Sequence, residues 1–248
     1  TLRDRKVDLS LKELSLESPR ITVMGNASGD LENKRTRVSL EGKEIDLDST
    51  RKLALALAGE NRAVANLFEL LKAGQVPFIR VKSESETIGD AFSLKNMTIE
   101  GRIEKGHLSL PGLGMELNDL KGDVSISGGI LEGSGLDAKI SGGSATNGRI
   151  KLDLLNDDGP FQLDAEVAAD HAHLFPVLEG LLEKNPMSRE YLRIKKIEGS
   201  AEGRIVLNGT IRSFKTNVDV SRFNLRAVCP PVPYPIVIQS GQFHYDDS

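Results

Sequence analysis

The chain has 248 residues with 39% hydrophobic content, enough for a sizeable core in one large domain or two ordinary ones. Its formal net charge of -4 is spread along the sequence, which argues against a nucleic-acid partner, because phosphate binding needs a concentrated basic face.

The single cysteine, Cys229, excludes an internal disulfide framework. We interpret it as a small buried hydrophobe, with a reactive or lipid-modified thiol as the alternative.

No signal peptide and no apolar run long enough to span a bilayer is visible. Thr1 stands where an initiator methionine would be, so we expect this sequence to be a piece of a longer protein whose anchor or signal lies elsewhere.

The first 48 residues alternate apolar and polar side chains, which predicts short strands over 7–16, 20–24, 35–40 and 44–47. Turns are predicted at Ser18-Pro19, at 26–30 and at 41–43. In the first strand the apolar phase slips between Leu11 and Leu14, which predicts a bulge or bend.

Helical spacing replaces the alternation over 49–74. Gly59 followed by Asn61 predicts two short helices with a kink, the second ended by Gly74 and Pro77. The apolar residues at this spacing are Leu53, Leu57, Val64, Leu67, Phe68 and Leu71.

Strands resume near Phe78, and the alternation is clearest from Gly159 to Val167. A second helical segment is predicted near 171–184, carrying Leu174, Leu178, Leu181 and Leu182, before strands run on to Tyr245 around a proline cluster at 230–235. Turns are predicted at Gly128-Gly129, 133–135, Gly142-Gly143, Asn147-Gly148 and Asn208-Gly209.

A weak internal repeat joins two places where a strand leads into a leucine-rich helix, at 44–48 and 165–170. We expect a single elongated molecule over 1–248, with two possible repeat units of about 1–98 and 99–248. Chance similarity among simple strand sequences is the alternative.

The sequence gives only weak signals for catalytic, phosphate-binding or metal-binding motifs. Residues 143–148 have the glycine spacing of a phosphate loop, but Arg149-Ile150 replace the Lys-Ser/Thr pair and a strand follows, so we interpret them as a turn. His171 and His173 could share a metal on a strand, but they fall where a helix is expected to begin. His107 and His244 stand alone. We expect no catalytic residue, no metal and no cofactor, and the protein is predicted not to be an enzyme.

Several segments resemble the AsmA-like family of bacterial envelope proteins, which includes TamB- and YhdP-type members. The segments that carry the resemblance are the run 106–126 with its continuation to Gly142-Gly143, Ile45 to Asp48, Pro160 to Glu166, Gly199 to Leu207, and Val218 to Ser221. Together they touch most of residues 35–225.

The resemblance implies a repeating β-groove: a long, curved antiparallel sheet with an apolar concave side and occasional helices. It also implies a periplasmic protein, tethered to the inner membrane by an anchor outside this sequence, that carries phospholipids between the inner and outer membranes and contributes to outer-membrane homeostasis. Envelope proteins are possible partners. Members of the family have no catalytic residues, so the resemblance assigns none to this chain.

The alternation and the resemblance agree on a mainly β fold with one apolar sheet face. We expect this face to bind phospholipid or another acyl lipid, since each CH2 group removed from water contributes about 0.8 kcal/mol. The residues predicted to line it are Leu108, Leu110, Val124, Ile126, Ile150, Leu152, Leu154, Phe161, Leu163, Val218 and Val220.

The alternative is an ordinary closed core in a non-catalytic structural or docking module. The same residues would then pack against one another and against a helical lid. That lid would be formed by Leu53, Leu57, Leu67, Leu71, Leu178 and Leu182.

Overall fold

The structure is a computed structural model of the chain. It describes residues 2–3, 6–30, 32–58, 62–87, 89–110, 115–156, 158–170, 196–210, 213–228 and 234–246. The strands are β1 (Leu2–Arg3), β2 (Lys6–Glu17), β3 (Arg20–Asp30), β4 (Arg35–Asp46), β5 (Leu71–Ser85), β6 (Met97–Leu110), β7 (Met115–Ser127), β8 (Ile130–Ile140), β9 (Gly143–Asp153), β10 (Phe161–Asp170), β11 (Lys196–Gly209), β12 (Phe214–Val228), β13 (Ile236–Ile238) and β14 (Phe243–Asp246). The helices are α1 (Leu47–Ala58), α2 (Arg62–Leu70), and two 3-10 turns, η1 (Asp90–Phe92) and η2 (Leu94–Asn96).

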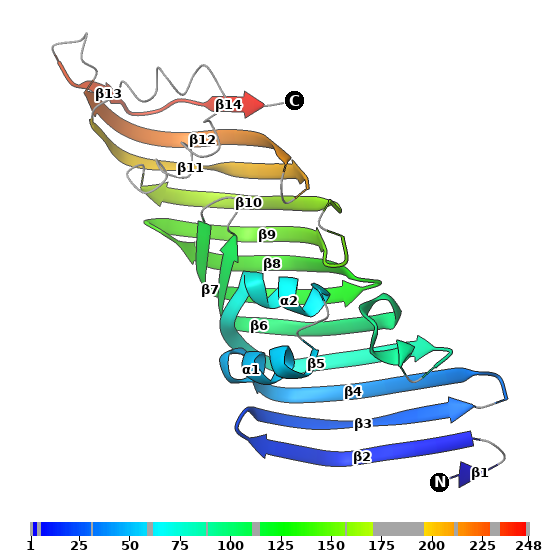
Figure 1. Ribbon diagram of the computed structural model, residues 1–248. Helices are drawn as coiled ribbons and strands as arrows, with labels where there is room; N and C mark the ends of the chain where they lie inside the picture. Colours follow the sequence, from blue (N-terminus) through cyan, green and yellow to red (C-terminus); the bar gives the residue numbers. More distant parts are fainter. Residues whose placement is uncertain are drawn as a thin grey trace.

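The described strands form one antiparallel sheet in which β1 to β13 follow one another in sequence order, while β14 pairs with β12. Figure 1 shows this as a long, twisted ribbon of strands, with β1 at one end and β13 and β14 at the other. The twist follows from the handedness of L-residue strands. The predicted fold class, mainly β with a long antiparallel sheet and a few helices, is confirmed.

Helices α1 and α2 lie between β4 and β5 in the chain and pack on β4, β5 and β6 (Figure 1). The prediction of two short helices in this region is confirmed, but their end is earlier than expected. Helix α2 stops at Leu70, and Gly74 and Pro77 lie inside β5. The helical segment predicted near 171–184 lies outside the described residues, as do His171, His173, Leu178, Leu182 and Cys229.

The two places where the sequence repeat was predicted have the same strand arrangement. Strands β4 and β5 are antiparallel neighbours with residues 47–70 between them, and β10 and β11 are antiparallel neighbours with residues 171–195 between them. The division into two repeat units stays a prediction.

Four of the predicted turns lie inside strands instead. Residues 26–30 belong to β3, 41–43 to β4, 133–135 to β8 and Asn147-Gly148 to β9. Asn147, with φ 54°, lies at a register shift against Asp164 and Glu166, so this Asn-Gly pair forms a bulge instead of a hairpin turn. Asn208-Gly209 ends β11, and beyond it the backbone N–H groups of Thr210 and Ser213 each donate to the other residue's carbonyl oxygen, at 2.8 and 3.2 Å. The turns at Ser18-Pro19 and Gly128-Gly129 are confirmed.

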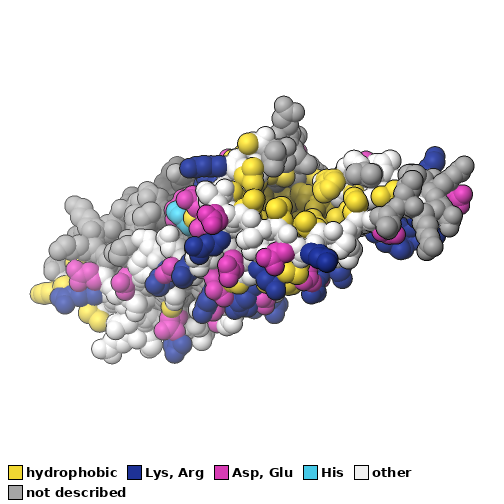
Figure 2. Space-filling view, turned by 90° about the horizontal axis from the view of Figure 1, so that it is seen from below, with side chains coloured by type: hydrophobic (Ala, Val, Ile, Leu, Met, Phe, Trp, Pro, Cys, Tyr) yellow, Lys and Arg dark blue, Asp and Glu magenta, His cyan; other side chains and the backbone are white. Residues whose placement is uncertain are grey.

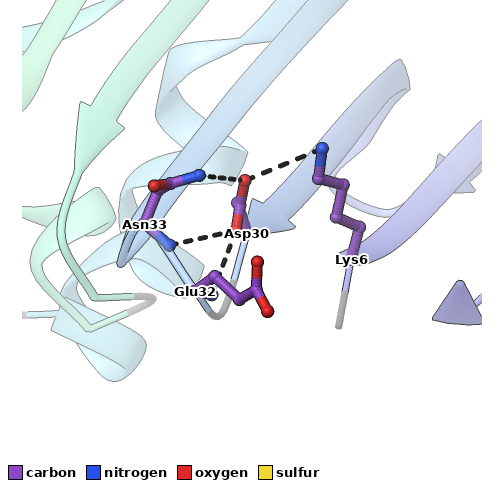
Figure 3. Close-up of polar contacts among 4 residues, drawn as sticks. All are labelled: Lys6, Asp30, Glu32 and Asn33. Carbon is purple, nitrogen blue, oxygen red and sulfur yellow. Dashed lines mark hydrogen bonds and ion pairs between the residues drawn. The ribbon is translucent and has the colours of Figure 1, made fainter. Parts of the chain in front are cut away.

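The real turn after β3 is held by the Asp30 carboxylate (Figure 3). It accepts hydrogen bonds from the backbone N–H groups of Glu32 at 3.0 Å and Asn33 at 3.1 Å, and from Asn33 Nδ2 at 2.8 Å. Lys6 Nζ lies 3.9 Å away. These contacts, with the Asn33 side-chain bond the largest cause, lower the pKa of Asp30. An Asp that binds backbone N–H groups two and three residues on forms a turn without needing glycine there.

Candidate functional site

The two faces of the sheet differ sharply in chemistry. Residues that stand directly opposite one another across neighbouring strands share a face, so the strand register identifies the members of each face. Two adjacent rows run across the strands from β2 to β12, and all of their residues except Thr216 are apolar or glycine.

The first apolar row consists of Leu11, Gly25, Leu40, Val81, Ile99, Ile126, Leu131, Leu152, Phe161, Gly209 and Phe214. The second apolar row consists of Leu14, Val23, Gly42, Ile79, Gly101, Val124, Gly133, Ile150, Leu163, Leu207 and Thr216. With about 4.8 Å between strands, each row spans about 48 Å measured along the sheet. We call the side that carries these rows the apolar face.

The bulge in β2 keeps the apolar face continuous at its first strand. Leu11 pairs with Gly25 and Leu14 pairs with Val23, so three steps along β2 match two steps along β3. In a regular strand, residues three apart point to opposite sides. The extra residue brings Leu14 and Leu16 to the same side as Leu9 and Leu11, as the slip in the sequence predicted.

Glycines on this face leave space that larger neighbours fill. A Cβ added to Gly42 would meet Ile79 Cγ2 at 2.8 Å, and one added to Gly133 would meet Ile150 Cγ2 at 2.8 Å and Leu136 Cδ1 at 2.9 Å. Branched side chains from the adjacent strand, and at Gly133 also from β8 itself, therefore lie over the bare backbone. This packing places apolar atoms along the rows even where a glycine interrupts them.

Exposure changes along the face. The four leucines of β2, Leu9, Leu11, Leu14 and Leu16, are between 38% and 63% exposed. In contrast, Leu152 is 3% and Leu207 1% exposed, and these two belong to a core cluster formed mainly by β6 to β11. Figure 2 shows hydrophobic side chains gathered in a hollow, with acidic and basic side chains on the adjoining outer surface. The face is thus open at β2 and filled at β9 to β11.

The C-terminal end of the same face is also partly open. Ile238 pairs with Leu225, and Phe243 pairs with Val220, so both stand on the apolar side of β12. Both are exposed, as is Ile236.

Ten of the eleven residues predicted to line the apolar face share it by strand register, and Leu154, just after β9, packs in the core cluster. Leu110, Ile126, Ile150, Leu152, Leu154, Phe161 and Val218 are buried, whereas Leu108, Val124, Leu163 and Val220 are half-buried. Six of them belong to the core cluster, and Leu108, Val124 and Leu163 pack against it. Val218 and Val220 lie on β12 outside it. Their contact with lipid stays a prediction.

Sequence reasoning missed the exposed apolar residues at both ends of the sheet. These are Leu9, Leu11, Leu14 and Leu16 at one end, and Ile236, Ile238 and Phe243 at the other. The alternation in β2 was visible, but alternation alone does not indicate how exposed the apolar side chains of a strand are.

The opposite face carries ion pairs between neighbouring strands, and we call it the charged face. Arg102 faces Asp123, with Nη1 3.0 Å from Oδ1, and Lys151 faces Glu132, with Nζ 2.9 Å from Oε1. Opposite charges directly across a strand pair stabilise the sheet modestly. A shallow hollow of about 860 Å³ lies on this face over β6 to β11, and these four side chains help to line it.

Arg204 and Asp164 form a bidentate ion pair on the charged face. Arg204 Nε donates to Asp164 Oδ1 at 2.7 Å and Nη2 donates to Oδ2 at 2.6 Å, in a bidentate arrangement. The hydrogen bonds from Arg204 are the main reason that the pKa of Asp164 lies below its ordinary value.

Both described histidines also lie on the charged face beside carboxylates. His107 Nε2 is 2.6 Å from Glu116 Oε2, and His244 Nδ1 is 2.5 Å from Asp219 Oδ1. Ser109 Oγ donates to the second oxygen of Glu116 at 2.7 Å, and this bond is the largest cause of the lowered pKa of Glu116. Since the carboxylate lies between serine and histidine, the histidine is not positioned to activate the hydroxyl.

Within the described residues, no group of three or more His, Cys, Asp or Glu side chains could hold a metal ion. In the same part of the chain, neither helix has the length and apolarity needed to cross a bilayer. A comparison with protein families, curated proteins and solved structures found no match for this chain.

Proposed function

We propose that this chain is a segment of a periplasmic AsmA-like protein whose apolar face binds phospholipid acyl chains and conveys them between the inner and outer membranes. The observation that carries the proposal is the pair of continuous apolar rows, which end in exposed leucines on β2. Leucine side chains exposed in a row along one strand favour an apolar ligand, because each CH2 removed from water contributes about 0.8 kcal/mol. The AsmA-like segments of the sequence support the assignment to the envelope.

The differing exposure along the face refines which residues contact lipid. An acyl chain needs free surface, so the exposed leucines of β2 and the half-buried Val23, Leu40 and Ile79 beside them are the better candidates. Lipid contact at Leu152 or Leu207 would require their neighbours to move apart.

A second candidate function is a structural or docking module without a ligand. The close burial of Leu152, Leu154 and Leu207 favours it, since these residues already satisfy one another. Under this function the β2 leucines would contact protein instead of lipid.

Site-specific photocrosslinking separates the two functions. A photoreactive amino acid at Leu9, on the apolar face, should label a co-purified phospholipid, whereas the same group at its neighbour Ser10, on the charged face, should not. Native mass spectrometry of protein purified without detergent should show the bound lipid directly. Equal labelling at both positions, or a lipid-free mass with no labelling, would contradict lipid binding.

Charge substitutions test the difference between the open and filled parts of the face. Leu9→Asp should fold normally and lose several-fold of its bound lipid, because Leu9 is largely exposed. Leu207→Asp should unfold, because a buried unpaired charge is very costly. Full lipid retention by Leu9→Asp would exclude the β2 end as the binding region.

A further inference from the structure

The ends of three neighbouring strands bend together away from the rest of the sheet. Figure 1 shows β6 and β7 turning sharply where β6 ends and β7 begins, so that these ends run across the direction of the other strands. The start of β5 is paired with the end of β6, with Leu71 opposite Leu108. We call residues 71–73, 106–110 and 115–120 the flap.

Register shifts mark the level at which the flap begins. Ile103 pairs with Gly122 and Gly106 pairs with Leu120, so three steps along β6 match two steps along β7. The register between β5 and β6 and between β7 and β8 shifts at the same level. Extra residues of this kind bend a strand, and here the bends of adjacent strands coincide.

All three strands have a residue with positive φ at this bend. The values are 147° at Gly74, 50° at Lys105 and 50° at Asp119. Few residues other than glycine adopt such φ values, so the surrounding structure must hold Lys105 and Asp119 in this conformation. Hinges in proteins consist of a few residues that absorb large changes of φ and ψ, and these three residues are placed to do so.

The flap helps to fill the buried part of the apolar face. Leu110, Leu117 and Leu120 are between 4% and 8% exposed and belong to the same core cluster as Leu152 and Leu207. Three further flap side chains pack against this cluster, namely Leu71, Leu108 and Met115. The flap therefore supplies some of the neighbours that would have to move before lipid could reach the cluster.

Few contacts join the flap to β8. Among the described residues of the flap, only Asn118 pairs with β8, where it stands opposite Lys139. Lys139 Nζ also lies 2.6 Å from Asp119 Oδ2. Both side chains of this ion pair are more than half exposed, so it contributes little to holding the flap down.

We propose that the flap is a hinged cover that swings at Gly74, Lys105 and Asp119 and gives access to the core cluster on the apolar face. Its role rests on the proposed function, since it controls entry to the face that binds lipid. Opening removes apolar side chains from the cluster, so the closed state dominates in water. An acyl chain that takes their place favours the open state, because it binds that state better.

Strand β7 crosses the bend, so the distance between its ends measures opening. Nitroxide labels at Glu116→Cys and Ser127→Cys, in a chain whose only cysteine carries Cys229→Ser, are eleven residues apart. A straight strand of this length spans about 36 Å. Pulsed electron paramagnetic resonance should show a shorter distance without lipid, and a second population near the straight-strand value with phosphatidylcholine vesicles.

A single distance that does not change with lipid would overturn the flap. If photocrosslinking at Leu9 succeeds in the same protein, lipid binding stands and only the flap is excluded. A longer population that appears with vesicles while Leu9 stays unlabelled would support the flap, and would place the bound lipid away from β2.

Charge reversal at the tether gives a second measurement that needs no lipid. Lys139→Glu repels Asp119 and should raise the longer population about threefold, and Lys139→Met should raise it less. Lys151→Glu is the matched control, because it disrupts a similar exposed ion pair with Glu132, outside the flap. It should leave the distances unchanged. Equal responses to Lys139→Glu and Lys151→Glu would contradict a hinge at this bend.

Discussion

Gly25 and Gly29 lie on the apolar side of the same strand, β3, but have very different surroundings. A Cβ at Gly25 would collide with the Ser39 carbonyl oxygen and with Leu40, whereas a Cβ at Gly29 would meet nothing within 4 Å. Gly25 thus allows close approach of β4, and Gly29 does not serve this purpose.

We therefore predict that Gly25→Ala lowers the free energy of unfolding by about 2 kcal/mol, because the backbone of β4 must shift. Gly29→Ala should be neutral or stabilising by about 0.5 kcal/mol, since alanine reduces the entropy of the unfolded chain. Urea unfolding followed by circular dichroism measures both. Equal effects would show that glycine at position 25 is not required for packing.

The Asp164–Arg204 pair should make stability depend on pH. The pKa of Asp164 is lowered in the folded state, so its contribution is present above the unfolded pKa, near 3.8, and is lost as pH falls through the folded pKa. Asp164→Asn should be less stable than wild type by about 0.5 kcal/mol at neutral pH, because Arg204 is exposed and solvent screens the pair.

This difference should shrink below about pH 4 and vanish in stronger acid. Thermal unfolding of both proteins from neutral to acid pH measures it. A difference that is constant with pH would mean that the ionised carboxylate is not what stabilises the pair.

At the scale of single elements, helix α1 begins with a side-chain cap. Asp46 Oδ1 accepts hydrogen bonds from the Ser49 backbone N–H at 3.0 Å and from Ser49 Oγ at 3.1 Å. The N–H bond is the largest cause of the lowered pKa of Asp46. This cap fixes the point at which the chain leaves β4 and starts across the sheet.

Asp46→Ala should cost about 1 kcal/mol of stability, while Asp46→Asn should retain most of it, because asparagine also caps helices well. Chemical unfolding of the two variants and the wild type provides the comparison. If the alanine and asparagine variants lose the same amount, the negative charge and not the cap geometry would account for the effect.

The alternation of apolar residues predicted most strands, and their helical spacing predicted α1 and α2, because burying one side of each element requires these patterns. The bulge of β2 was also predicted, because leucines mark both sides of the slip. Other bulges left no comparable sign. Lys105 and Asp119 adopt positive φ values of 50° beside register shifts in β6 and β7, although neither residue is glycine. Asn147-Gly148 has the composition of a turn, and only its pairing partners show that it is a bulge.

The apolar residues of the candidate site could be predicted, but not their exposure. Leu9 and Leu152 occupy similar places in the alternation, yet one is largely exposed and the other is buried. The difference depends on how many strands flank each residue and on what packs above it. Both are properties of the assembled sheet, which a local pattern does not contain.

At the scale of the whole molecule, the charged face and the apolar face continue across β2 to β12 without exchanging sides. Register shifts occur in several strand pairs, and each is accommodated by an extra residue instead of a reversal of faces. A change of one residue would otherwise turn the leucines of a strand toward the charged side.

The order of the strands has one more consequence. Because β1 to β13 each hydrogen-bond to strands adjacent in sequence, cohesion passes from neighbour to neighbour, as in proteins built from stacked repeats. Gain or loss of a complete hairpin during evolution would therefore lengthen or shorten the molecule while leaving the remaining pairings as they are. Overall reach is then adjustable in steps of two strands, separately from the chemistry of either surface.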